Sequence, residues 1–144
     1  MSGGLPRLKP RVLVVDDDPT SRYVVEHDLL NLGAEVLVAA DGKEGLRMLL
    51  DNVLDLDLLV TDLEMPGMDG MALVRMVRAE GGEGDLPILV ISGWLDPEVR
   101  SALHALGAAV VDKGDGANTV AASARRLLAS RGWHIVDGKA QAPR

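Results

Sequence analysis

Five short, predominantly apolar runs divide the chain, and none of them alternates regularly between apolar and polar residues. The runs are Val12–Val15, Val36–Val38, Leu58–Thr61, Ile88–Ile91 and Ala108–Val111. A short continuous apolar run bounded by turn residues is typical of a strand that is buried on both faces, as in a parallel sheet. The pattern therefore predicts five buried strands.

Apolar residues at helical spacing follow each run. Asp18-Pro19 and Asp96-Pro97 predict helix starts, because aspartate accepts hydrogen bonds from the first turn and proline suits the first helical position. Asp41-Gly42 and Asp69-Gly70 begin two more helices, and glycines 33 and 107 are placed to end the first and the fourth. The expected inward-facing residues are Val25, Leu29 and Leu32; Leu46, Leu49, Leu50 and Val53; Leu73, Val74 and Val77; Val99, Leu103 and Leu106; and Val120, Ala124, Leu127 and Leu128.

Strands that alternate with helices indicate parallel βα units with right-handed crossovers. We expect an α/β fold with a doubly wound five-stranded parallel sheet in the flavodoxin-like order 2-1-3-4-5, covered on both faces as three α/β/α layers. This domain is expected at residues 11–131. Residues 1–10, which contain several glycines and prolines, predict a flexible N-terminal arm. Residues 132–144 have no evident pattern and predict a C-terminal tail that Trp133 packs down.

The composition narrows the class of protein. With 144 residues, 47% of them hydrophobic and 26% charged, the chain suits one soluble globular domain. The absence of cysteine excludes a disulfide scaffold and thiolate metal sites. No apolar stretch approaches the about 20 residues of a membrane span, so we expect a cytoplasmic protein without membrane insertion. The net charge of -7 argues against direct binding to nucleic acid.

Acidic residues follow two of the predicted strands at the point where each strand ends. Asp16 and Asp17 follow the first strand and Asp62 ends the third, and these strands are neighbours in the expected order. Carboxylates that meet in this way repel unless one is protonated or a cation neutralises them. Hard oxygen ligands favour Mg²⁺ over Zn²⁺. Ser92 and Lys113 end the fourth and fifth strands and supply a donor and a positive charge for phosphoryl oxygens.

In combination, these residues resemble the receiver domain of bacterial two-component response regulators over Arg11 to Arg131. The motifs that carry the resemblance are Val-Val-Asp-Asp-Asp-Pro at 14–19, Asp62 with Met65-Pro66 and Met68-Asp69-Gly70, Ser92-Gly93, and Lys113. The resemblance implies a signalling phosphoacceptor of a two-component system or phosphorelay rather than an enzyme. Its partners would be a histidine kinase or histidine phosphotransfer protein and a downstream protein target.

The resemblance also implies roles for the acidic residues. Asp62 would be the phosphoacceptor, whose carboxylate attacks the phosphorus of a phosphohistidine. Asp17, Asp62 and the backbone carbonyl of Glu64 would hold Mg²⁺, and Asp16 would help directly or through water. The phosphorylated state would signal through the surface formed by the fourth helix, the fifth strand and the fifth helix.

Further residues of the crevice take implied roles as partners or modulators of the phosphoryl group. Lys113 would pair with it, Ser92 would move to hydrogen-bond it, and Gly93 would leave room for it. Glu64 and Trp94 occupy the positions that affect the lifetime of the aspartyl phosphate in the family. We hypothesise that Trp94 shields the phosphoryl group from in-line water.

Two positions depart from the family pattern. Val110 replaces the aromatic residue that receivers usually carry three residues before the lysine, and the segment from Gly107 to Lys113 is one residue shorter than usual. Gly114 replaces the proline that usually follows the lysine, often with a cis bond. Because a cis bond to a non-proline residue costs about 2.5–4 kcal/mol, we predict a trans peptide and a more mobile loop at 113–118.

Two alternatives remain open at this point. One is a protein-interaction module that signals without phosphorylation, which the departures at Val110 and Gly114 permit. The other is a phosphatase of the haloacid-dehalogenase type, because Asp16 to Thr20 fits its D-x-D-x-T pattern with Asp16 as nucleophile. The acidic motif that such phosphatases carry after the lysine is missing here, and the turn after Asp62 would be left unexplained.

Overall fold

The computed structural model describes residues 7–52, 55–65, 67–80, 86–115 and 118–142. Its main sheet has five parallel strands in the order β2-β1-β3-β4-β5, which confirms the predicted topology. The strands are β1 Arg11–Val15, β2 Glu35–Ala39, β3 Leu58–Asp62, β4 Ile88–Ser92 and β5 Ala109–Asp112. The helices are α1 Pro19–Asn31, α2 Gly42–Asn52, α3 Gly70–Glu80, α4 Pro97–Ala105 and α5 Asn118–Ser130, and a 3₁₀ turn occupies Lys113–Asp115.

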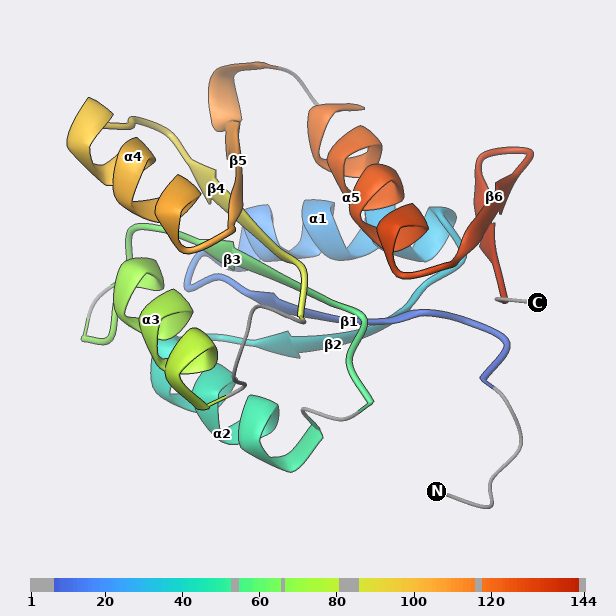
Figure 1. Cartoon of the computed structure of the whole chain (residues 1–144), viewed down its shortest axis with the longest axis horizontal. Helices are drawn as coiled ribbons and strands as arrows, with labels where there is room; N and C mark the ends of the chain where they lie inside the picture. The colour runs from blue at the N-terminus through green and yellow to red at the C-terminus, as the bar shows by residue number, and fades with distance from the viewer. Residues whose placement is uncertain (1–6, 53–54, 66, 81–85, 116–117, 143–144) are drawn as a thin grey trace.

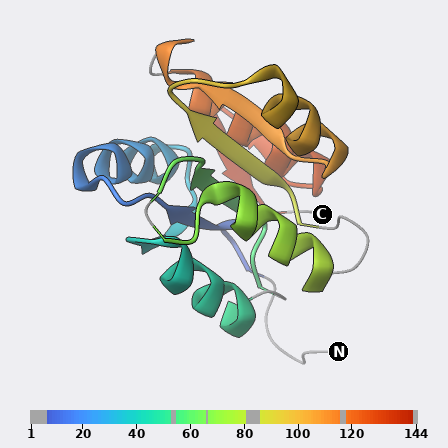
Figure 2. The ribbon, with the colours of Figure 1, turned by 90° about the vertical axis from the view of Figure 1, so that its left-hand side faces the viewer.

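Helices cover both faces of the sheet (Figures 1 and 2). Helices α1 and α5 lie on one face, where Val12 and Val14 of β1 belong to the core, and α2, α3 and α4 lie on the other with Leu13 and Val15. Successive residues of a strand point to opposite faces, so both sets are buried. This explains why the strand runs show no alternation.

The helix ends form as the sequence predicts. The Asp18 carboxylate accepts hydrogen bonds from the Thr20 and Ser21 amides, and Asp96 accepts one from Glu98, so each aspartate caps its helix. Glycines 33 and 107 follow α1 and α4 with φ values of +94° and +72°, a conformation that favours glycine.

One predicted inward position is wrong. Leu50 of α2 is 58% exposed, whereas Leu49 beside it is buried. Consecutive helical residues point about 100° apart, so the two leucines do not share the inward direction. Val53, which was expected on the same face, lies outside the described residues.

The C-terminal segment contains a structure that the sequence analysis did not predict. Strands β6 (His134–Val136) and β7 (Lys139–Gln141) form an antiparallel hairpin, and Asp137-Gly138 makes its turn with φ values of 52° and 77°. The Ala140 amide donates to the Leu32 carbonyl over 2.8 Å, and Trp133 is buried in the core on the α1–α5 face. The hairpin therefore anchors the chain end beside the end of α1.

Part of the predicted flexible arm contacts the domain. Residues 1–6 lie outside the described part. Arg7 donates to the buried Asp57 carboxylate over 2.8 Å, and Pro10 is buried, with its carbonyl accepting from the Glu35 amide. Across the described residues, no helix is long and apolar enough to cross a membrane.

Candidate functional site

Three aspartates converge at the carboxyl ends of β1 and β3. Asp16 and Asp17 directly follow β1, and Asp62 is the last residue of the neighbouring strand β3. Each offers one carboxylate oxygen, and these three oxygens lie within 4.8 Å of one another. Asp16 and Asp62 are only 3% and 5% exposed, whereas Asp17 is exposed to solvent. The site therefore consists of two buried carboxylates, those of Asp16 and Asp62, and one solvent-facing carboxylate, that of Asp17.

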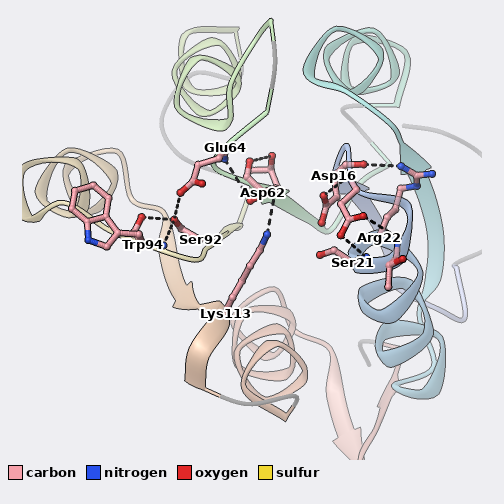
Figure 3. Close-up of polar contacts among 11 residues, drawn as sticks. Asp16, Ser21, Arg22, Asp62, Glu64, Ser92, Trp94 and Lys113 are labelled. Carbon is pink, nitrogen blue, oxygen red and sulfur yellow. Dashed lines mark hydrogen bonds and ion pairs between the residues drawn. The ribbon is translucent and has the colours of Figure 1, made fainter.

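Local contacts hold Asp16 in place at this junction. Its Oδ1 accepts a hydrogen bond from the Asp18 amide over 2.9 Å, and its backbone carbonyl accepts one from Arg22 Nη1 over 2.8 Å. Figure 3 shows Arg22 reaching back from α1 to this carbonyl. Both contacts come from the capped start of α1, so the helix cap also orients the acidic residue.

The turn after Asp62 is fixed by a close approach of backbones. The Gly70 amide, at the start of α3, donates to the Leu63 carbonyl over 2.9 Å. A Cβ atom at Gly70 would overlap the Asp62 carbonyl oxygen and lie 2.8 Å from Leu63 Cα. From the sequence, Gly70 was expected as a helix start and as part of the Met68-Asp69-Gly70 motif, and this close approach was missed. Its place in the turn after Asp62 was the available signal, but the contact itself depends on the tertiary fold.

Lys113 reaches the acidic cluster from the end of β5. Its Nζ lies 3.4 Å from Asp62 Oδ2, and the lysine side chain is 39% exposed. Figure 3 shows the Lys113 side chain extending from β5 with its ammonium group directed toward Asp62. The predicted convergence of strand ends therefore brings together Lys113 and all three aspartates.

Ser92 is the last residue of β4, the strand next to β3, and its hydroxyl has competing hydrogen-bond partners. The hydroxyl is 2.6 Å from the Trp94 carbonyl and 3.2 Å from Glu64 Oε1, and it accepts from the Trp94 amide. A hydroxyl has one proton, so it donates to only one of these acceptors at a time. The link from Ser92 to the Glu64 side chain was not foreseen, because Glu64 was expected only to offer its backbone carbonyl to the metal and to affect the lifetime of the aspartyl phosphate.

Trp94 does not cover the acidic cluster in this structure. Its side chain is 70% exposed and, in Figure 3, is directed away from Asp62. The ring would have to turn inward to shield a group on Asp62, so the shielding role stays a prediction.

The electrostatics of the cluster are unbalanced at Asp62. Burial raises the pKa of its carboxyl above the ordinary aspartate value, and the Asp16 charge raises this pKa further. The Lys113 ammonium and the Glu64 amide act in the opposite direction without overcoming those two effects. Part of the acidic charge is therefore left uncompensated by the protein.

A divalent cation fits this arrangement. The donors are three hard carboxylate oxygens on two adjacent strand ends, and the exposed Asp17 leaves the cluster open to water. Mg²⁺ binds through one or two carboxylates and retains several waters. The acidic cluster of this fold could thus hold Mg²⁺, which would compensate the charge that Lys113 leaves.

The departures from the family pattern have clear structural counterparts. Val110 on β5 is half-buried against the core that faces α4. The Lys113–Gly114 peptide is trans, as predicted, and the Gly114 amide donates to Asp112 Oδ1 over 2.8 Å. Residues 116–117 of the expected mobile loop lie outside the described part. A Cβ at Gly93 would meet only Lys113 Cδ, at 3.9 Å, and the role of Gly93 in leaving room for a phosphoryl group stays a prediction.

The fold and the site define a class of protein: a doubly wound α/β domain with an acidic cluster at the switch point of its strand order. The family model of the response regulator receiver domain matches residues 12–129. The chain therefore belongs to the response regulator receiver domain family of two-component signalling.

Individual relatives support this assignment. The chain is 39% identical to the sensor histidine kinase TmoS of Ectopseudomonas mendocina over 95 residues, which are 66% of this chain and 10% of that protein. It is 41% identical to a chemotaxis protein CheY homolog of Campylobacter jejuni over 83 residues, 57% of this chain and 63% of that protein. The matched segments thus span less than two thirds of these relatives.

Solved structures share the fold over nearly their whole length. The Vibrio cholerae chemotaxis protein CheY4 has a TM-score of 0.74 and 32% identity, covering 83% of this chain and 98% of that chain. The receiver domain of the hybrid histidine kinase CckA has a TM-score of 0.67 and 34% identity, covering 82% of this chain and 98% of that chain. The family model ends before the C-terminal hairpin.

Proposed function

We propose that Asp62 accepts a phosphoryl group from a phosphohistidine and that the chain relays this signal in the cytoplasm. The donor would be a histidine kinase or a histidine phosphotransfer protein. The main support is the position of Asp62, whose carboxylate lies beside those of Asp16 and Asp17 and 3.4 Å from the ammonium of Lys113. A carboxylate at this point can meet a phosphoryl group, with the Lys113 ammonium on hand for its oxygens and the neighbouring carboxylates available to hold a cation.

The transfer is a nucleophilic substitution at phosphorus. An oxygen of the ionised Asp62 carboxylate forms a bond to phosphorus while the bond from phosphorus to the donor's imidazole nitrogen breaks. The electron pair of that bond leaves with the imidazole, which takes up a proton from solvent. The buried backbone of β3 holds Asp62 in position, and Lys113 presents its positive charge 3.4 Å from the Asp62 carboxylate.

Asp16, Asp17, Asp62 and the backbone carbonyl of Glu64 are the proposed ligands of Mg²⁺. When bound, the ion supplies positive charge that reduces carboxylate repulsion and the negative charge of the phosphoryl oxygens. The chain's own contribution is to hold two carboxylates buried and one exposed, so that the site remains accessible to solvent and donor.

The proposed switch begins at Ser92. To hydrogen-bond a phosphoryl group on Asp62, its hydroxyl has to release the Trp94 carbonyl, to which it now lies at 2.6 Å. This change alters the segment between β4 and α4, which leads directly into the Asp96 cap of α4. We propose that the α4–β5–α5 surface carries the signal to a downstream protein.

Intact mass after incubation with acetyl phosphate and Mg²⁺ tests the proposed function. We expect one added phosphoryl group on the wild type and none on Asp62→Asn. Asp57→Asn is the matched control, because Asp57 is equally buried but lies at the opposite end of β3. That variant should be modified like the wild type.

Two results would contradict the proposal. If acetyl phosphate adds no group and beryllofluoride with Mg²⁺ leaves the amide spectrum unchanged, the chain acts as an interaction module without phosphorylation. If the group maps to Asp16 and the protein steadily hydrolyses phosphate esters, the phosphatase reading is correct instead.

A further inference from the structure

A groove of about 650 Å³ lies between the segment that follows Asp62 and the helix α4. Val99 contributes to it from α4 and Met71 from the first turn of α3, and Figure 2 shows these helices as neighbours on one face of the sheet. Its volume is within the range of small-molecule sites, about 300–1,000 Å³. The lining residues are Leu63, Glu64, Met65, Asp69, Met71 and Val99.

Four of these lining residues are apolar. Met65 is buried, and Leu63, Met71 and Val99 are half-buried. Methionine side chains are flexible, so they adapt to ligands of different shape, and their sulfur atoms make favourable contacts with aromatic rings. The lining therefore suits an apolar ligand body, and an aromatic one above all.

The other two lining residues are acidic. Glu64 and Asp69 are both exposed, and neither forms an ion pair within the described residues. The first turn of α3 carries a partial positive charge of about half a unit, but the Asp69 carboxylate already accepts a hydrogen bond from the Ala72 amide there, over 2.8 Å. Two full negative charges outweigh this partial charge, so the groove attracts a cation.

We propose that this groove binds a small organic cation, namely a protonated amine on an apolar and preferably aromatic body. The ammonium group pairs with Glu64 and Asp69, and the body lies against Met65, Met71 and Val99. An inorganic cation would leave the apolar lining unused, and an organic anion would face two carboxylates. The amine is the class of ligand that matches both parts of the groove.

Glu64 connects the groove with the residue at which the proposed switch begins. Its Oε1 lies 3.2 Å from the Ser92 hydroxyl, which donates its one proton either there or to the Trp94 carbonyl. An amine paired with Glu64 therefore competes with the Ser92 hydroxyl for the same carboxylate. This connection rests on the proposed function, whereas binding of the amine requires neither Mg²⁺ nor a phosphoryl group.

NMR of the wild type labelled with ¹³C-methyl methionine tests the binding without any substitution. The probe is phenethylamine, with phenethyl alcohol, phenylacetate and ethylamine as its neutral, anionic and ring-less analogues. Phenethylamine should shift the Met65 and Met71 methyl signals with a Kd on the order of 1–10 mM, as expected of so small a ligand. Phenethyl alcohol should bind more weakly, and the other two analogues should not bind measurably. The signals of Met48 on α2 and Met76 on α3, outside the groove lining, should not move.

Conservative substitutions test the role of the two acidic residues. Glu64→Gln and Asp69→Asn each remove one charge and keep the shape of the side chain, and asparagine at 69 retains an acceptor for the start of α3. Each should weaken amine binding about two- to fivefold, the range for one exposed ion pair, and leave the binding of phenethyl alcohol unchanged. Glu98→Gln is the matched control, because Glu98 is an exposed acidic residue of α4 outside the groove lining. This variant should bind phenethylamine like the wild type.

Four outcomes would overturn the inference. It fails if phenethylamine leaves the Met65 and Met71 signals unchanged up to its solubility limit, or if phenylacetate binds as tightly as the amine. It also fails if ethylamine shifts the same signals equally, because the ammonium group alone then explains the binding, or if Glu98→Gln weakens binding as much as Glu64→Gln. The titrations contain no Mg²⁺ and no phosphoryl donor, so failure of this inference and failure of the phosphoacceptor proposal are distinguishable.

Discussion

Replacing Asp62 by asparagine should stabilise the protein when no divalent cation is present. The structure leaves Asp62 buried with Asp16, and the carboxylate oxygens of the cluster lie within 4.8 Å of one another. At an effective dielectric constant of about 20, two charges at 4.8 Å repel by about 3.5 kcal/mol. The half-exposed Lys113 recovers about 0–1 kcal/mol of this. Because asparagine also gives up the contacts of the carboxylate with Lys113 and the Glu64 amide, we expect a net gain of about 1–2 kcal/mol for Asp62→Asn.

Urea unfolding at several pH values, with and without Mg²⁺, measures this gain. Because the pKa of Asp62 is raised in the folded state, the folded chain binds its proton more strongly than the unfolded chain does. The stability that Asp62 gains from holding its proton in the folded state is therefore fully present below the ordinary aspartate pKa, and it is lost as pH rises through the raised pKa. The advantage of Asp62→Asn should grow over the same range, and Mg²⁺ should reverse it by stabilising the wild type about 2.7 kcal/mol at a hundredfold excess over Kd.

Asp57→Asn is the control of opposite sign. Asp57 is also 5% exposed, but it accepts hydrogen bonds from Arg7 and from the Arg11 amide, and it lies 3.9 Å from Arg131. Its replacement should cost about 1.5–3 kcal/mol, the range for hydrogen bonds to charged groups. If Asp62→Asn destabilises the Mg²⁺-free protein at neutral pH as Asp57→Asn does, charge repulsion at Asp62 is not the dominant effect.

Three further substitutions test single features of the structure. Gly70→Ala should destabilise the fold by about 1–3 kcal/mol or more in urea unfolding, because the added Cβ overlaps backbone. The control Gly93→Ala, whose Cβ would make only an ordinary contact with Lys113 Cδ at 3.9 Å, should change stability little. Trp133→Ala should cost about 3–5 kcal/mol by the same measurement, and a negligible cost would mean that the hairpin packs only loosely. Trp94→Ala should change the rate at which labelled Asp62 loses phosphate, followed by intact mass; an unchanged rate would remove the shielding hypothesis.

The sheet and the acidic cluster were predictable because local patterns determine them. Each strand is a continuous apolar run, and the order of parallel strands places the ends of β1 and β3 side by side. Once that order is expected, the meeting of Asp16, Asp17 and Asp62 follows from their position in the chain. Lys113 follows for the same reason, since it directly succeeds β5.

The features that escaped prediction depend on contacts between distant residues. The hairpin consists of two three-residue strands, too short for a visible alternation, although Asp137-Gly138 is a recognised turn signal. Arg7 is anchored by Asp57, fifty residues away in the chain. The Ser92–Glu64 contact depends on how the loops after β3 and β4 approach each other, which no local spacing encodes.

One buried aspartate, Asp57, directly precedes strand β3, and another, Asp62, ends it. The contrast between these two residues explains how the domain can be both stable and reactive. The guanidinium groups of Arg7 and Arg131 and the backbone amide of Arg11 compensate the charge of Asp57, so we expect this carboxylate to stabilise the fold and to have little capacity to bind a ligand. Asp62 has one half-exposed lysine against two other carboxylates, so its charge is compensated only when a cation joins the site. Because the protein leaves the charge of Asp62 undercompensated, cation binding should change the free energy of unfolding more through Asp62 than through Asp57. The same substitution, aspartate to asparagine, should therefore have opposite effects at the two positions, and the sign at Asp62 should depend on Mg²⁺.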